Sequence, residues 1–289
     1  MTKPIILIYS PSLLADLVYR EFINNHHDLI ECAIELPYIP RSKTKKKKLL
    51  KEPILKKIFL GPAPSFLFFM GLVVTLHNVF SNLLKNSLSD LLKSKRVKVH
   101  RWHAIDKDLL KLLHEKQPDW IFNNSTSILR PNLINIPKFG VINYHGGKLP
   151  EFRSVACIFW MLIHNEQYVN GTLHYVSEGI DDGDIIDNGT KFSTNEGYST
   201  FKLWTLIGAS SYQSFKKLIP YIENREKCPA KQQNHNKANT YSFPTRKDIN
   251  VLKSKGYSTF ESRDILLFLK ILFDKNVYKT TIIKRREKQ

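Results

Sequence analysis

Cysteine is scarce in this chain of 289 residues. The three cysteines, Cys32, Cys157 and Cys228, are widely spaced, and no Cys-x-x-Cys pair occurs. An odd number with this spacing argues against a disulfide framework and against a structural zinc site. The N-terminus holds only a five-residue apolar run before polar residues begin, which is too short for a signal peptide. We therefore expect a cytoplasmic protein.

The glycine fingerprint of dinucleotide-binding proteins is also missing. Residues 4–9 (PIILIY) are typical of a buried strand, residues 10–24 of a capped helix and residues 29–36 of a second strand. No Gly-x-Gly-x-x-Gly follows the first of these strands. The order strand, helix, strand nevertheless predicts the start of a parallel α/β sheet.

Acidic residues are outnumbered by basic ones, 26 to 44, which gives a net charge of +18. The excess is uneven: residues 41–57 carry +8 and residues 224–289 carry +10, whereas residues 101–223 carry −1. A near-neutral body with two basic segments suggests that these segments, rather than the core, meet an anionic partner. The alternative is that their lysines are only solvated.

Apolar runs of membrane-spanning length are lacking. Residues 58–84 contain no Asp, Glu, Lys or Arg, but two prolines on one side and His77 on the other leave about a dozen apolar residues, and a spanning helix needs about 20. We expect a buried helix within an insertion over residues 41–95. The alternative is a helix in a membrane interface, with residues 41–84 in peripheral contact with anionic lipid.

The α/β alternation resumes after the insertion. The pattern predicts strands over 97–102, 120–123, 140–144, 171–176 and 184–192, and helices over 105–115, 153–165 and 200–222. Beyond that helix the chain is polar, then basic with two short apolar stretches at 265–273 and 280–283.

Two short segments carry the densest chemistry. Asn143 and His145 end a predicted strand, so they share one side of it at the edge of the sheet where ligands bind. An amide and an imidazole placed in this way could hold a carbonyl oxygen together. The second segment, Gly179-Ile-Asp-Asp-Gly-Asp184, reads as a turn whose carboxylates could orient the imidazole. Each signal alone also fits a structural histidine or an ordinary hairpin turn.

Together these segments resemble the folate-dependent formyltransferase family, and its sugar N-formyltransferase branch in particular. The resemblance rests on Asn143-Tyr-His145, Leu149-Pro150, Arg153 and Gly179-Ile-Asp181-Asp-Gly183, preceded by Ile128-Leu-Arg-Pro131. It departs from the family at Gly146-Gly147 and at Ser154, and neither change removes a functional group.

The resemblance implies a Rossmann-like formyltransferase fold, with a mostly parallel twisted sheet and helices on both faces. Residues 1–223 would form the catalytic domain and residues 224–289 a small basic C-terminal extension. The implied reaction transfers a formyl group from N10-formyltetrahydrofolate to a primary amine, without a metal. By resemblance, Asn143 and His145 donate to the developing oxyanion, His145 also moves the amine proton, and Asp181 orients His145 or relays the proton.

The resemblance also places further contacts. The implied folate contacts are Ser125, Ser127, Ile128, Leu129, Gly179 and Gly183. The implied substrate or loop residues are Lys148, Pro150 and Arg153.

The amine acceptor is less determined. Phe159-Trp160 resembles the sugar-amine branch, so we expect a nucleotide-linked or lipid-linked amino sugar of a surface polysaccharide, whose phosphates would suit a lysine-rich rim. Alternatives are methionyl-tRNA formylation, hydrolysis of formyltetrahydrofolate, or a non-enzymatic basic module that binds membrane or nucleic acid. A homodimer could form through residues 58–76 or 265–273.

Overall fold

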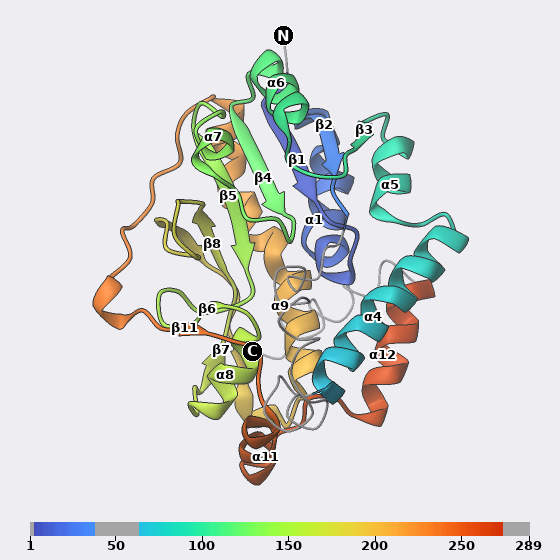
Figure 1. The fold of residues 1–289 in the computed structure, drawn as a ribbon, viewed down its shortest axis with the longest axis vertical. Coiled ribbons are helices and arrows are strands. Elements are labelled where there is room, and N and C mark those ends of the chain that lie inside the picture. Colours follow the sequence, from blue (N-terminus) through green and yellow to red (C-terminus); the bar gives the residue numbers. More distant parts are fainter. Residues whose placement is uncertain (1–2, 38–63, 274–289) are drawn as a thin grey trace, which may run out of the picture.

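The computed structural model describes residues 3–37 and 64–273 (Figure 1). Its centre is a seven-stranded sheet in the order β3-β2-β1-β4-β5-β8-β9. The first five of these strands are parallel, and β8 runs antiparallel to both of its neighbours, β5 and β9. The strands are β1 (Ile5–Tyr9), β2 (Ile30–Glu35), β3 (Lys98–Arg101), β4 (Trp120–Asn124), β5 (Gly140–His145), β8 (Thr172–Tyr175) and β9 (Ile185–Asn188). The mostly parallel sheet confirms the predicted fold class.

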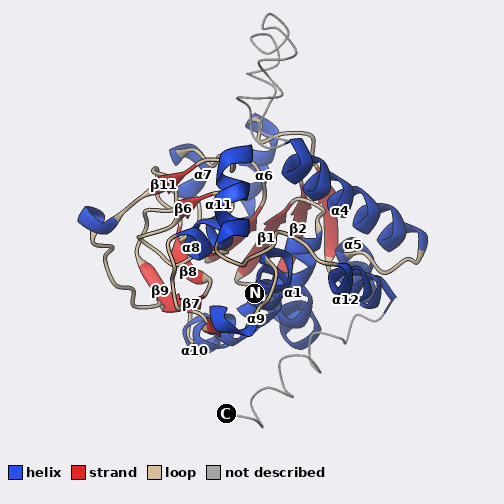
Figure 2. Ribbon diagram, turned by 90° about the horizontal axis from the view of Figure 1, so that it is seen from below, coloured by secondary structure: helices blue, strands red, loops and turns tan. Residues whose placement is uncertain are grey.

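Helices cover both faces of the sheet because the central strands are apolar on both sides (Figure 2). In β1, Ile5 and Leu7 face one core cluster, while Ile6 and Ile8 face another. The first cluster is covered by α1 (Leu13–His26), α5 (Leu88–Ser94) and α9 (Thr200–Phe215), and the second by α6 (Lys107–Lys116) and α7 (Pro131–Ile134).

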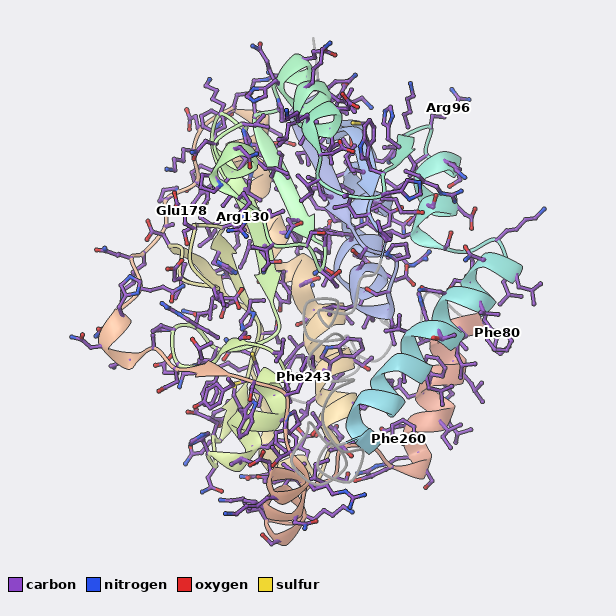
Figure 3. All side chains as sticks on the ribbon, viewed as in Figure 1. Phe80, Arg96, Arg130, Glu178, Phe243 and Phe260 are labelled. Atoms are coloured by element: carbon purple, nitrogen blue, oxygen red, sulfur yellow. The ribbon has the colours of Figure 1, made fainter. Side chains whose placement is uncertain are left out.

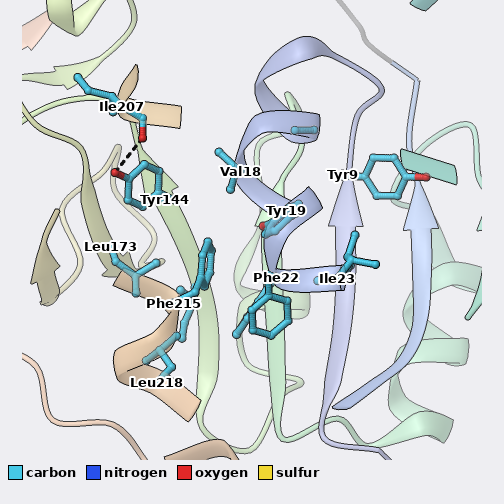
Figure 4. Packing of buried hydrophobic residues seen from close by; sticks show 14 of the residues in the cluster. Tyr9, Val18, Tyr19, Phe22, Ile23, Tyr144, Leu173, Ile207, Phe215 and Leu218 are labelled. Carbon is cyan, nitrogen blue, oxygen red and sulfur yellow. Dashed lines mark hydrogen bonds between the residues drawn. The ribbon is translucent and has the colours of Figure 1, made fainter. Parts of the chain in front are cut away.

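The larger core supports β5 (Figure 4). Phe22 of α1 and Phe215 of α9 pack with their ring centroids 5.6 Å apart, and Phe215 lies 5.2 Å from Phe122 of β4. Tyr144 of β5 is buried, and its hydroxyl donates to the carbonyl oxygen of Ile207 in α9. The strand that carries the candidate site is therefore held against α9 by both apolar packing and a buried hydrogen bond.

The helix predicted over residues 153–165 is wrong in its first turn. Only α8 (Cys157–Ile163) is helical, because Ser154 and Ala156 have positive φ angles of 81° and 54°, which a right-handed helix does not allow. Arg153–Ser154 form β6, which pairs with β11 (Thr240–Tyr241). A long-range strand pair therefore replaces the start of the helix.

Two other predicted elements are divided. The strand over 184–192 becomes β9 and a short β10 (Phe192–Ser193), which pairs with β7 (Tyr168–Val169). The helix over 200–222 becomes α9, a 3-10 turn and α10 (Ile219–Glu223). Pro220 stands at the start of α10, where its missing N–H costs no helical hydrogen bond.

The insertion contains α4 (Pro64–Leu83), and the polar and basic end of the chain contains α11 (Arg246–Ser254) and α12 (Ser262–Phe273). The helix expected in the insertion is present, and within residues 71–83, whose side chains the structure describes, it is buried on one side, through Val73, His77 and Ser81. The basic part of the insertion and the apolar stretch at 280–283 lie outside the described residues. Among the helices that the structure describes, none combines the length and the apolar content needed to cross a bilayer.

Candidate active site

The direction in which successive strands are added to the sheet reverses between β1 and β4. The chain moves outward from β1 to β3 and then returns to the other side of β1, so the loops after β1 and β4 diverge at the same edge. Ser10 N donates to Asn124 O at 3.3 Å, and Thr126 N donates to Ser10 Oγ at 3.3 Å. Such a switch point in an open α/β sheet is where ligands bind. The candidate residues of β5 lie one strand further along this edge.

The antiparallel pairing of β5 with β8 adds a histidine to the site. Asn143 lies opposite His174, and His145 lies opposite Thr172. His174 Nδ1 donates to the carbonyl oxygen of Tyr175 at 2.7 Å, so its Nε2 is free to accept from Asn143 Nδ2 at 3.3 Å. Burial lowers the pKa of His174 to about 4, although the Asp181 carboxylate opposes this shift. His174 is thus a neutral imidazole that orients the Asn143 amide.

His145 is surrounded by groups that accept hydrogen bonds. Its Nε2 donates to the carbonyl oxygen of Phe152 at 2.8 Å and lies 3.2 Å from Cys157 Sγ, while its Nδ1 lies 3.6 Å from Asp181 Oδ2. Burial alone lowers the pKa of His145, but the charges of Cys157 and Asp181 outweigh it and raise that pKa to about 10. With an acceptor facing each nitrogen, the ring is held as an imidazolium.

Asp181 is held in a turn that few sequences could adopt. Its φ is 49°, in the left-handed region that aspartate tolerates better than most residues. Its Oδ2 accepts from the backbone N–H of Ser154 at 2.9 Å, and its Oδ1 lies 3.9 Å from His174 Nε2. Gly183 completes the turn, because a Cβ there would lie 2.1 Å from Tyr175 O. One carboxylate therefore faces both histidines.

The structure brings Asn143, His145 and Asp181 together, whereas Lys148 and Arg153 point to other partners. Lys148 forms an ion pair with Glu166 at 3.1 Å. Pro150, in the loop between Lys148 and Arg153, is buried. Arg153 is also buried, and its Nη2 donates to Gln233 Oε1 at 2.7 Å and lies 3.1 Å from His235 Nδ1.

Gln233 is a site residue that sequence reasoning missed. Its side chain is 4% exposed, and its Nε2 donates to Asp181 O at 3.0 Å and to Gly183 O at 2.7 Å. Because Oε1 accepts from Arg153, one carboxamide joins the Arg153 loop to the Asp181 turn. Gln233 lies in a polar stretch without periodicity, so no local signal pointed to it. His174 did carry a signal, since it stands in a predicted strand that could pair beside Asn143.

Aromatic rings hold this part of the C-terminal extension in place. Tyr241 stacks on Phe152, with ring centroids 5.5 Å apart, and on Trp160, with ring centroids 5.1 Å apart. The Trp160 indole N–H donates to Ser242 O at 2.9 Å. The Phe159-Trp160 pair of the sequence therefore has separate surroundings: Phe159 is fully buried in the core, and Trp160 packs on the extension.

The loops expected to contact folate are the one after β4 and the one that contains Asp181, and Figure 3 labels Arg130 and Glu178 in them. Ile128 is 66% exposed and Ile180 is 54% exposed, so each loop presents an apolar side chain. The other implied contacts differ in their surroundings: Ser125 Oγ donates to Asn123 Oδ1 at 2.8 Å, Ser127 is half-buried, Leu129 is in the core, Gly179 is exposed in a turn where an added Cβ would overlap Asp182, and Gly183 is buried in its turn.

Among the described residues, no group of three or more His, Cys, Asp and Glu side chains could hold a metal ion.

The segment that contains these residues has known relatives. Residues 81–190 match the formyl transferase family. A methionyl-tRNA formyltransferase of Clostridioides difficile (strain 630) is 31% identical over 133 residues, which cover 46% of this chain and 42% of that protein. The chain thus spans less than half the length of the curated relatives that it matches first.

Solved structures share the fold over more of the chain. An N-formyltransferase from Helicobacter canadensis, in complex with folinic acid and dTDP-3-aminofucose, has a TM-score of 0.53 at 20% identity and covers 86% of this chain and 73% of its own. Glycinamide ribonucleotide transformylase 1 from Symbiobacterium toebii has a TM-score of 0.52 at 13% identity, with coverage of 81% and 95%. The chain therefore shares the fold of these formyltransferases, and the segment that matches the formyl transferase family contains Asn143, His145 and Asp181.

Proposed function

We propose that this chain transfers a formyl group from N10-formyltetrahydrofolate to the primary amine of an amino sugar. The observation that carries the proposal is the cluster at the carboxyl end of β5. There the Asn143 amide lies within hydrogen-bond reach of His174. The Asp181 carboxylate lies within ion-pair reach of both His174 and the charged His145 imidazole. These are the groups that an acyl transfer to an amine requires.

The formyl donor supplies an activated carbonyl carbon. In the reaction a bond forms between the acceptor nitrogen and the formyl carbon, the bond from that carbon to N10 breaks, and one amine proton is transferred to N10. His145 and Asn143 would donate to the carbonyl oxygen as negative charge develops on it. Loss of one such donor typically costs about 3 to 4 kcal/mol of transition-state stabilisation.

Asp181 would act through His145 and on the proton. Its carboxylate lies 3.6 Å from His145 Nδ1, so it favours the charged ring that the oxyanion needs. It is also the carboxylate placed to accept the amine proton and pass it on. His174 would not carry a proton, since its low pKa leaves it neutral, and it would keep the Asn143 amide turned toward the site.

The acceptor is proposed from the structural relatives. One solved structure with the same fold holds a nucleotide-linked amino sugar, which favours a small acceptor. The names of the curated relatives favour methionyl-tRNA instead, so tRNA is the second candidate.

The test is a formyl-transfer assay with the purified chain. Nucleotide-linked amino sugars and charged initiator tRNA are offered separately with N10-formyltetrahydrofolate, and formylated products are detected by mass. We expect a formyl adduct on an amino sugar, and no folate product without an amine. His145→Ala and Asp181→Ala should each abolish the adduct, and turnover that survives both changes contradicts the assignment. Formylation of tRNA alone would select the second candidate, and amine-independent turnover would indicate a hydrolase.

A further inference from the structure

The outer sides of α4 and α12 hold most of the exposed large apolar side chains in the described residues. The described residues hold twelve exposed large apolar side chains. Eight of them belong to α4, to the residue that follows it, or to α12. We name these eight the α4–α12 surface: Leu72, Val79, Leu83, Leu84, Ile265, Leu266, Leu269 and Phe273. Leu83 is 73% exposed, and Leu266 and Phe273 are each 63% exposed. A group of this size is unusual on a solvated helix pair.

The two helices lie side by side at one edge of the molecule in both views (Figures 1 and 2). Their inner sides supply Val73, Phe268 and Ile271 to a core cluster shared with α1 and α9. A helix on the surface of a globular protein ordinarily has a polar outer side. Here α12 is apolar on both sides, so burial of the inner side leaves an apolar row facing away from the protein.

This surface is presented on a firmly attached element. Asp16 of α1 is 1% exposed and contacts both Arg20 and His77, with Oδ2 lying 3.3 Å from His77 Nε2. At the other end, Asn86 Nδ2 donates to Leu272 O at 3.2 Å and so ties the end of α4 to α12. Buried charged and polar contacts therefore fix the helix pair to the catalytic core.

The sequence on both sides of the surface is basic. Residues 41–57, which precede α4, carry a net +8, and residues 274–289, which follow α12, hold six Lys or Arg and two acidic residues. Within residues 58–84 no charged residue occurs. A second copy of the chain would bring two such cationic sets together, which costs electrostatic free energy. An anionic bilayer complements both the apolar rows and the flanking charge.

We propose that the α4–α12 surface seats this protein on an anionic lipid bilayer. The apolar side chains of this surface enter the boundary between headgroups and acyl chains, and the net positive charge of the adjoining sequence favours an anionic headgroup layer. The helices rest on the bilayer and do not cross it. This docking is independent of the formyl acceptor, because the eight side chains lie outside the catalytic cluster.

The test is co-sedimentation of the full chain with vesicles. One set contains phosphatidylcholine alone, and the other contains equal parts of phosphatidylcholine and phosphatidylglycerol. We expect binding to the anionic set only, weakened by added salt. The variant Leu83→Ser/Leu266→Ser/Phe273→Ser should bind about tenfold or more weakly, since three exposed apolar groups are lost. The matched control is Tyr168→Ser, an exposed apolar residue outside the surface.

Three results would overturn the proposal. Equal vesicle binding by the triple variant and by the Tyr168→Ser control would show that the α4–α12 surface does not bind the bilayer. Equal binding of the unsubstituted chain to both vesicle sets would show that lipid charge plays no part. Absence of vesicle binding, together with a dimer that the triple variant converts to a monomer in light scattering, would assign the surface to a second copy. Substitution of Lys45 to Lys48 by Gln tests the charge separately and should weaken binding without changing the unfolding temperature.

Discussion

The side-chain nitrogen of Gln233 lies 3.0 Å from the main-chain oxygen of Asp181, although 52 residues separate the two in sequence. The same nitrogen donates to Gly183 O, and the side-chain oxygen accepts from Arg153. The C-terminal extension thus reaches into the catalytic core and holds the turn that presents the Asp181 carboxylate to the histidines.

Substitution of Gln233 should lower activity through Asp181. In Gln233→Ala the turn loses two hydrogen bonds and Arg153 loses an acceptor, so we expect kcat to fall about tenfold to a hundredfold from misplacement. Stability should fall by about 1 to 3 kcal/mol. The measurement that is specific to positioning is the pH–rate profile. If Asp181 moves away from His145, the His145 pKa falls, and the alkaline limb of the profile should move to lower pH. Gln232→Ala, at the exposed neighbouring position, is the control and should leave both quantities unchanged.

Asp181→Asn should change the pH dependence of formyl transfer. The His145 pKa is raised to about 10, so the charged ring, and with it activity, should persist until the pH approaches that value. Removal of the carboxylate charge lowers the His145 pKa by about one to three units, and the alkaline limb should follow. We also expect kcat to fall about a hundredfold or more. An alkaline limb that stays in place would show that Asp181 does not set the His145 charge.

The free energy of unfolding should also depend on pH through the charge of His145. A pKa raised in the folded state gives stability that is fully present below the unfolded value of about 6.5 and is lost as the pH rises through about 10. The wild-type free energy of unfolding, measured by denaturant titration, should therefore decrease across this interval more steeply than that of His145→Gln. Parallel curves for the two proteins would mean that the folded ring is not preferentially charged.

His174→Ala should impair the Asn143 donor without moving the alkaline limb. The amide loses the acceptor that orients it, and we expect kcat to fall about tenfold to a hundredfold with little change in KM. His174→Gln, whose side-chain oxygen can accept from Asn143, should recover part of the loss. A full loss in both variants, with a lowered unfolding temperature, would assign His174 to folding alone.

The central architecture was accessible from the sequence. Residues 4–9 and 120–122 are continuous apolar runs typical of buried strands, and the alternation with amphipathic helices favours a parallel sheet. Asn143 and His145 stand at a predicted strand end and Asp181 in a glycine turn, but the local pattern alone also fits structural roles, and it is the resemblance of the combined motifs to a known family that implies the three as site residues.

Other features depended on contacts between distant segments. The helix predicted from residue 153 fails because Arg153 N instead donates to Asn239 O, and no property of residues 153–156 reveals that partner. The one-sided burial of α4 likewise depends on α1 and α12, since an apolar run alone does not tell which of its sides a neighbour will cover.

The sequence by itself determined the sheet and the order of most of its elements, because these follow from hydrophobic periodicity within short windows. It also led to Asn143, His145 and Asp181 as candidates, through motifs that resemble those of a known family. Only the tertiary structure decided that His174 orients Asn143, that Gln233 holds Asp181, and that an apolar surface remains on α4 and α12. Each of these rests on side chains brought together across 31 to 186 residues of sequence, where hydrogen-bond geometry and shared burial choose the partners.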